Sequence, residues 1–138
     1  MTDKTEFYRS LMASAVAARE FSYSPYSGYR VGAALLGADG RIYTGCNIEN
    51  AGYSPTNCAE RTAVFKAVSE GEREFTAIAV VGGSGDTLNA ACTPCGVCRQ
   101  VLAEFCAADM PVILGTPENL RVLTLGDLLP FAFTKKNL

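Results

Sequence analysis

One apolar run, residues 75–81, limits the folds that this chain can adopt. Only Thr76 interrupts the run, whereas a strand with one face in water alternates apolar and polar residues. The run therefore predicts a strand that other elements cover on both faces. We expect helices to pack on the faces of this strand, because Leu11, Ala15 and Ala18 recur at helical spacing near the N-terminus.

Further strands and helices are predicted on both sides of this run. Asp39-Gly40 is a strong hairpin signal between two of the strands. Only residues 115–119 join the last two strands, and a parallel crossover needs about a dozen residues or more, so these strands should pair antiparallel. The order predicts an α/β fold with a sheet of about five strands and helices on both faces. The expected strands are 30–36, 41–48, 75–81, 111–114 and 120–123, and the expected helices are 3 onward, 58–70, 93 onward and 125–129.

The composition limits the partners and the chemistry. At 138 residues the chain is expected to form a single domain, residues 1–138. The formal charge is −2 and no basic run appears, which argues against nucleic acid as a partner. No apolar run approaches the roughly 20 residues of a membrane helix, and no signal peptide is seen, so a soluble cytoplasmic protein without a membrane partner is expected. Because histidine is absent, proton transfer near neutral pH must rely on a carboxylate, Tyr, Lys, a thiol or metal-bound water.

The spacing of the cysteines indicates a metal site. Six cysteines without a secretion signal favour metal binding or burial over disulfides. Cys95 and Cys98 are three residues apart, so a helix would place both thiols on one face near its N-terminus. Cys58 is expected at the start of the preceding helix, and both helix N-termini favour the thiolate form. Three thiolates suit a catalytic zinc, which keeps its fourth position for water.

Two side chains beside Cys58 complete the candidate centre. Glu60 could move the protons that a metal-activated water requires, and Arg61 is the candidate cation that offsets the thiolate charges. Glu60 could instead pair with Asn57 to cap the helix. Arg61 and Arg99 could equally be solvated helix charges.

The other cysteines leave one alternative open. Cys92 could be a fourth ligand that closes the site, although Thr93-Pro94 should turn it away from the helix. That alternative describes a zinc-stabilised binding module without catalysis. Cys46 and Cys106 are interpreted as buried small residues.

Two polar residues on one predicted strand indicate a second part of the site. Asn47 and Glu49 share a strand face, so their side chains can reach the same object. As edge-strand polar residues they could also simply be solvated.

These segments together resemble the short, homotetrameric class of the cytidine deaminase family, over almost the whole chain. Relatives of this class often use His as the first ligand, so ligation by cysteine alone also favours it. The motifs that carry the resemblance are Pro25-Tyr26-Ser27, Val31-Gly32-Ala33-Ala34, Gly45-Cys46-Asn47-Ile48-Glu49-Asn50, Cys58-Ala59-Glu60-Arg61-Thr62-Ala63, Pro94-Cys95-Gly96-Val97-Cys98-Arg99-Gln100 and Leu128-Leu129-Pro130.

The resemblance implies a fold and an activity. The fold would be a three-layer α/β/α sandwich with a five-stranded mixed sheet whose last two strands are antiparallel. The activity would be the zinc-dependent hydrolytic deamination of cytidine and deoxycytidine to uridine and deoxyuridine with release of ammonia, in pyrimidine salvage. A close alternative is a deaminase of the same fold that acts on another aminopyrimidine nucleoside.

The resemblance also implies a role for each site residue. One zinc ion per subunit would be held by Cys58, Cys95 and Cys98, with Glu60 as the proton shuttle. Tyr29 stands where the family usually has a Phe that stacks on the base. The substrate contacts implied within one subunit are Asn47 and Glu49 to the ribose and the Ala59 backbone to the pyrimidine, and those implied across a homotetramer with shared active sites are Ala51 and Tyr53 to the ribose and Phe133, or Phe131, to the base.

Overall fold

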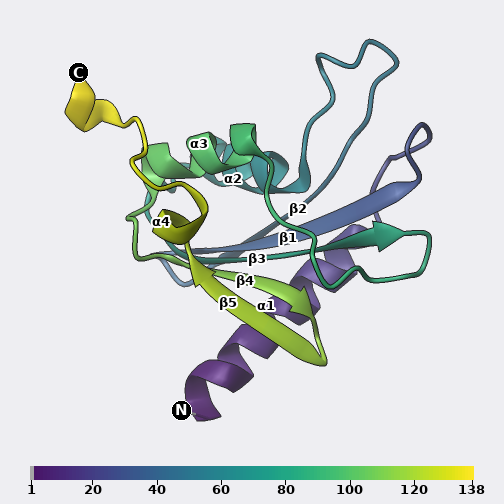
Figure 1. Cartoon of the computed structure of the whole chain (residues 1–138), viewed down its shortest axis with the longest axis horizontal. Helices are drawn as coiled ribbons and strands as arrows, with labels where there is room; N and C mark the ends of the chain where they lie inside the picture. Colours follow the sequence, from purple (N-terminus) through teal and green to yellow (C-terminus); the bar gives the residue numbers. More distant parts are fainter. Residues whose placement is uncertain (1) are drawn as a thin grey trace.

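The computed structural model describes residues 2–138, with side chains from residue 4 onward. A five-stranded sheet lies between two layers of helix (Figure 1). Within the described residues, no helix combines the length and the apolar character needed to cross a membrane. The strands are β1 (Tyr29–Gly37), β2 (Ile42–Cys46), β3 (Phe75–Ser84), β4 (Pro111–Thr116) and β5 (Asn119–Thr124), and the helices are α1 (Thr2–Arg19), α2 (Ala59–Ser69), α3 (Gly96–Phe105), α4 (Leu125–Leu128) and the 3-10 helix η1 (Lys135–Asn137).

The apolar run 75–81 forms the central strand. The strand order is β2-β1-β3-β4-β5, which places β3 in the middle, as the sequence predicts. β1 pairs antiparallel with β2 and with β3, while β3 and β4 form a parallel pair. β4 pairs antiparallel with β5, as the short connection between them requires. The sheet is therefore mixed.

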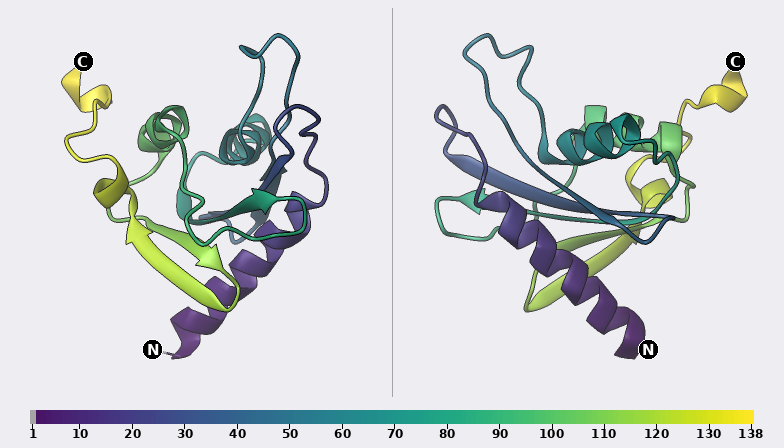
Figure 2. Two further views of the ribbon diagram at one scale, coloured as in Figure 1. Left: turned by 45° about the vertical axis from the view of Figure 1, so that its right-hand side comes forward. Right: turned by 180° about the vertical axis from the view of Figure 1, so that it is seen from behind.

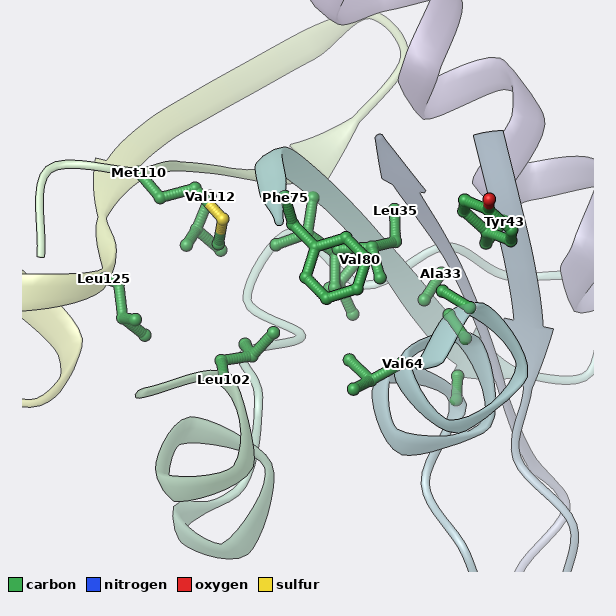
Figure 3. Packing of buried hydrophobic residues seen from close by; sticks show 14 of the residues in the cluster. Ala33, Leu35, Tyr43, Val64, Phe75, Val80, Leu102, Met110, Val112 and Leu125 are labelled. Atoms are coloured by element: carbon green, nitrogen blue, oxygen red, sulfur yellow. The ribbon is translucent and has the colours of Figure 1, made fainter. Parts of the chain in front are cut away.

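The two faces of β3 contribute to two separate cores. Ala77, Ala79 and Val81 pack with α1, whereas Ile78 and Val80 point to the opposite face. On that opposite face, Val64 of α2 and Leu102 of α3 project onto the sheet (Figure 3). Burial of one such side chain contributes about 1.5–3 kcal/mol to folding. Figure 2 shows α1 alone on one side of the sheet and α2 and α3 on the other, so the three-layer α/β/α sandwich is confirmed.

A glycine on β2 allows the first turn of α2 to lie against the sheet. A Cβ atom on Gly45 would stand 2.5 Å from the carbonyl oxygen of Ala59, which is closer than any side chain tolerates. The close contact brings the start of α2, and with it Cys58, next to the end of β2.

Several predicted boundaries are wrong, among them the end of β2, the end of β3 and the start of α3. β2 ends at Cys46 rather than at residue 48, because Asn47 uses its side-chain oxygen to accept from the Val31 amide at 2.9 Å. β3 continues to Ser84 instead of turning into a loop at residue 82, because its glycines still pair with β1. α3 begins at Gly96 with Cys95 as its N-cap, so Thr93 does not cap it.

Candidate metal centre and active site

Two helix N-termini bring three thiols together. Cys58 is the N-cap residue of α2, Cys95 is the N-cap residue of α3, and Cys98 lies in the first turn of α3. Neither N-cap side chain makes a capping hydrogen bond to the backbone of its helix, so neither sulfur is used in capping. The three Sγ atoms lie within 4.8 Å of one another, and Cys58 Sγ is 3.7 Å from Cys95 Sγ.

This spacing fits a zinc ion. A Zn–S bond of about 2.3 Å in tetrahedral geometry separates neighbouring sulfur atoms by about 3.8 Å. The observed separation of 3.7 Å between the Cys58 and Cys95 sulfur atoms needs almost no adjustment. The donor set could hold one metal ion and would leave one tetrahedral position for another ligand.

Cys92 lies apart from this cluster. Within the part of the chain whose side chains are described, the metal-binding group consists of Cys58, Cys95 and Cys98 and does not include Cys92. Cys92 is buried, and a Cβ atom on Gly82 would stand 2.7 Å from its sulfur, so this thiol packs over β3. The geometry therefore favours an open centre over one that a fourth cysteine closes.

Arg61 contacts the thiols directly. Its Nη2 atom donates to Cys58 Sγ at 3.2 Å. The pKa of the Cys58 thiol lies below its ordinary value because Cys98 and then Arg61 hydrogen-bond to the thiolate. The pKa of Cys98 is raised for the complementary reason, since Cys98 keeps the proton that it shares with Cys58. Arg61 is thus half-buried against negative sulfur, and the interpretation of it as a solvated charge is wrong.

Glu60 is buried beside the cluster. Its side chain is only 4% exposed, and burial raises the pKa of its carboxyl group to about 7. The capping interpretation is wrong, because Cys58 and not Asn57 is the N-cap residue. Asn57 instead donates to the Thr62 hydroxyl at 3.2 Å. The carboxyl group is therefore available for chemistry at the thiol cluster.

One cavity joins the metal cluster to the polar residues that follow β2. Its volume is about 270 Å³, and it brings together most of the residues singled out from the sequence. A second, more open cavity shares Glu49 and Ser27 with it and extends to Tyr53. The candidate residues that line the first cavity are Tyr29, Asn47, Glu49, Cys58, Ala59, Glu60 and Cys95, and Cys92 also borders it.

Three of the candidate substrate contacts lie outside the first cavity. Ala51 is exposed, Tyr53 is 77% exposed in the same loop, and Phe133 is 58% exposed near the C-terminus. Phe131, the alternative to Phe133, is fully exposed. Within a single chain these residues do not meet the metal cluster.

Asn47 has little unused hydrogen-bonding capacity. Its Oδ1 atom accepts from the Ser22 hydroxyl and from the Val31 amide, and its Nδ2 atom donates to the Tyr29 carbonyl at 2.8 Å. One Nδ2 hydrogen remains, so Asn47 faces the cavity as a donor.

Glu49 is the complementary acceptor. It accepts from the amides of Tyr26 at 3.0 Å and Ser27 at 3.1 Å, and from the Ser27 hydroxyl. These bonds, the Ser27 hydroxyl first, lower the pKa of its carboxyl group and keep it ionised. Asn47 and Glu49 therefore offer one donor and one acceptor to the same space, and neither is an ordinary solvated residue.

Ser27 belongs to a motif that carries the resemblance, but no site role was predicted for it. Its hydroxyl donates to Glu49 and accepts from the Tyr29 amide at 3.0 Å, so it holds together two walls of the cavity. The signal that could have found it is its position two residues before Tyr29 in a turn, where serine hydroxyls often bond to the backbone. The Tyr29 hydroxyl itself lies near Cys92 and Asn89, and burial raises its pKa to about 12.

Comparison with known proteins decides the family. Residues 5–114 match the model of the cytidine and deoxycytidylate deaminase zinc-binding region. The chain belongs to this deaminase family. The resemblance seen in the motifs is thereby confirmed, and the protein is an enzyme, a zinc-dependent hydrolase.

Relatives support the assignment over nearly the whole length of both this chain and theirs. The chain is 56% identical to the cytidine deaminase of Sporosarcina psychrophila, over 93% of this chain and 92% of that one. The crystal structure of cytidine deaminase from Burkholderia pseudomallei matches with a TM-score of 0.82 and 48% identity, over 90% of this chain and 97% of that one. For the enzyme from Mycobacterium tuberculosis the TM-score is 0.75 at 41% identity, over 91% and 96%.

Proposed function

We propose that this deaminase hydrolyses cytidine and deoxycytidine to uridine and deoxyuridine, with release of ammonia, in pyrimidine salvage. The observation that carries the proposal is a single cavity that joins two thiols of the three-thiol cluster and a buried carboxyl group to a donor and an acceptor suited to sugar hydroxyls.

The thiols would hold the metal. Cys58, Cys95 and Cys98 are the proposed ligands of one zinc ion per subunit, because their sulfur spacing suits tetrahedral zinc. When bound, zinc supplies a Lewis acid that lowers the pKa of a water molecule to about 7. Arg61 would offset part of the excess negative charge of the three thiolates.

Glu60 would carry the protons. Its carboxylate would accept one proton from the attacking water and donate it to N3 of the pyrimidine. It would then take the second proton of that water from the hydroxyl now bonded to C4 and pass it to the amino group, which leaves as ammonia while the C4 carbonyl forms. A group that acts in turn as base and acid works best with a pKa near the working pH, and burial already raises the pKa of Glu60 to about 7.

The polar wall would select a nucleoside. The remaining Nδ2 hydrogen of Asn47 would donate to one ribose hydroxyl oxygen, and the ionised Glu49 would accept from another hydroxyl. The Tyr29 ring would stack on the base, and the Ala59 backbone at the start of α2 would bond to the pyrimidine.

The exposed candidates would act in a neighbouring subunit. We infer a homotetramer in which Ala51 and Tyr53 reach the ribose, and Phe133 or Phe131 reaches the base, of another chain's site. The exposure of these aromatic side chains supports this inference. We also infer that residues 1–138 act as one domain and that the enzyme works in the cytoplasm, where its six unpaired thiols would stay reduced.

A substrate panel tests the proposal. Purified enzyme should convert cytidine and deoxycytidine, followed by ultraviolet absorbance and by ammonia release, and should lose that activity on chelation and regain it with zinc. Faster turnover of a different aminopyrimidine nucleoside would replace the proposed substrate. Absence of ammonia from every nucleoside would contradict the function.

A further inference from the structure

Arg99 is not the solvated charge that it could have been. Its guanidinium is half-buried, with Nε donating to the Pro94 carbonyl at 2.7 Å and Nη1 donating to the Leu128 carbonyl at 2.6 Å. Among residues with described side chains, no carboxylate forms a salt bridge with it. Its direction is therefore set by two main-chain carbonyls rather than by an opposite charge.

The two carbonyls belong to regions with different tasks. Pro94 is fully buried and directly precedes Cys95, one of the clustered thiols. Leu128 ends α4, from which residues 129–138, here called the C-terminal segment, continue past α3 (Figure 1). The neighbouring side chain adds a second connection, since Gln100 Nε2 donates to the Phe133 carbonyl at 2.8 Å.

We propose that Arg99 is a positioning residue that couples the metal-binding loop, residues 94 and 95, to the C-terminal segment, through one guanidinium held between the Pro94 and Leu128 carbonyls. The inference rests on the proposed role of Cys95 as a zinc ligand. Because Pro94 and Cys95 are adjacent, a shift of the Leu128 carbonyl displaces the Arg99 side chain and with it the backbone next to a ligand. The segment that presents Phe131 and Phe133 is thus tied to the metal centre of its own chain.

Arginine suits this position for a geometric reason. Its planar guanidinium directs several N–H donors along fixed directions, whereas a lysine ammonium is a single point of charge on a flexible stem. Lysine at residue 99 could reach one carbonyl but could not hold both in the observed arrangement. Arg99→Lys therefore keeps the charge and breaks the coupling.

Coupling of this kind is reciprocal. If attachment of the C-terminal segment tightens zinc binding, then bound zinc must shift that segment towards its attached state by the same factor. The wild-type enzyme alone can show this. Hydrogen exchange of residues 129–138 should become several-fold faster when zinc is removed, while the hairpin turn at 38–40, near the opposite edge of the sheet, should not change.

The test compares Arg99→Lys with Arg41→Lys. Arg41 is an exposed arginine that pairs with Glu70 at 3.1 Å, so its replacement controls for the chemical change alone. Arg99→Lys should release zinc to a colorimetric chelator about tenfold faster, as expected for the loss of one charge-assisted hydrogen bond. In that variant the exchange of residues 129–138 should be fast with or without zinc. Arg41→Lys should match wild type in both measurements.

The outcomes separate this inference from the proposed function. Wild type that holds zinc and deaminates cytidine, but whose C-terminal segment exchanges equally with and without zinc, would overturn the coupling and leave the function intact. Unchanged zinc release in Arg99→Lys would overturn it as well. Should Arg99→Lys fail to fold, the zinc dependence of exchange in wild type still decides.

Discussion

The first turns of α2 and α3 have the same kind of N-cap residue, but their charged side chains have different partners. Each starts with a cysteine whose side chain does not cap its helix, and each carries an arginine within the next turn. In α2, Glu60 is buried beside the thiols and Arg61 bonds to Cys58. In α3, Arg99 points to main-chain carbonyls at the base of the C-terminal segment. Two helix starts can thus supply the same kind of ligand while one adds chemistry and the other adds support.

Replacement of Glu60, the buried acid in the first turn of α2, should have the largest effect on activity. Glu60→Gln keeps the size of the side chain but cannot move a proton, and positioned acid–base groups contribute about 10²–10⁴-fold to rate. We expect kcat for cytidine to fall by at least about 10³-fold, because Glu60 serves several proton transfers. Zinc content, measured by elemental analysis, should stay at one per chain. A variant with more than a tenth of wild-type activity would show that another group moves the protons.

Removal of a thiol should affect both helix starts equally. Cys58→Ser and Cys98→Ser each delete one proposed zinc ligand, one from α2 and one from α3. Both should lose zinc during dialysis and lose activity in parallel, with zinc affinity lowered by more than about 100-fold, since even residues that only support a ligand contribute 10–100-fold. Full zinc retention in either variant would remove that cysteine from the ligand set.

Replacement of Arg61, the cation in the first turn of α2, should shift the pH dependence of zinc binding and of kcat. Arg61 lowers the pKa of Cys58 and of Glu60. Loss of this cation in Arg61→Gln should raise the pKa of both groups. Protons would then compete with zinc for the Cys58 thiolate at higher pH, so zinc loss on acidification should begin at higher pH. The acidic limb of the kcat profile should move the same way, with activity at neutral pH about tenfold lower, while Arg61→Lys should recover most of the loss. Identical profiles for Arg61→Gln and wild type would contradict the charge argument.

The smallest effect should come from the cysteine that lies outside the cluster. Cys92→Ser should keep one zinc per chain and change kcat by less than about threefold, because the Cys92 sulfur packs over β3. The matching Cys95→Ser should lose its zinc. Zinc loss from Cys92→Ser at the rate of Cys95→Ser would favour a four-cysteine structural site.

The main features of the fold could be predicted from local signals in the chain. An uninterrupted apolar run identified β3 as the covered central strand, and a short connection made β4 and β5 antiparallel. Element ends were harder to predict, because side chains from distant segments decide them. Asn47 ends β2 by bonding to the Val31 amide, and that bond depends on the pairing of β1 with β2.

In the site, too, local features could be predicted from the sequence and long-range contacts could not. The cluster of Cys58, Cys95 and Cys98 follows from the positions of the cysteines near helix starts, which spacing reveals. The direction of Arg99 does not, because its partner Leu128 lies 29 residues further along the chain. Residue spacing predicts contacts within one helical turn, but it cannot predict a bond that only the packing of α4 beside α3 creates.

The central claim is a metal centre with three sulfur ligands and one open position beside Glu60. X-ray absorption spectroscopy at the zinc edge of the purified enzyme tests it most directly. The account predicts about three sulfur atoms at about 2.3 Å and one oxygen or nitrogen atom at about 2.0 Å. Four sulfur atoms around the zinc would contradict it.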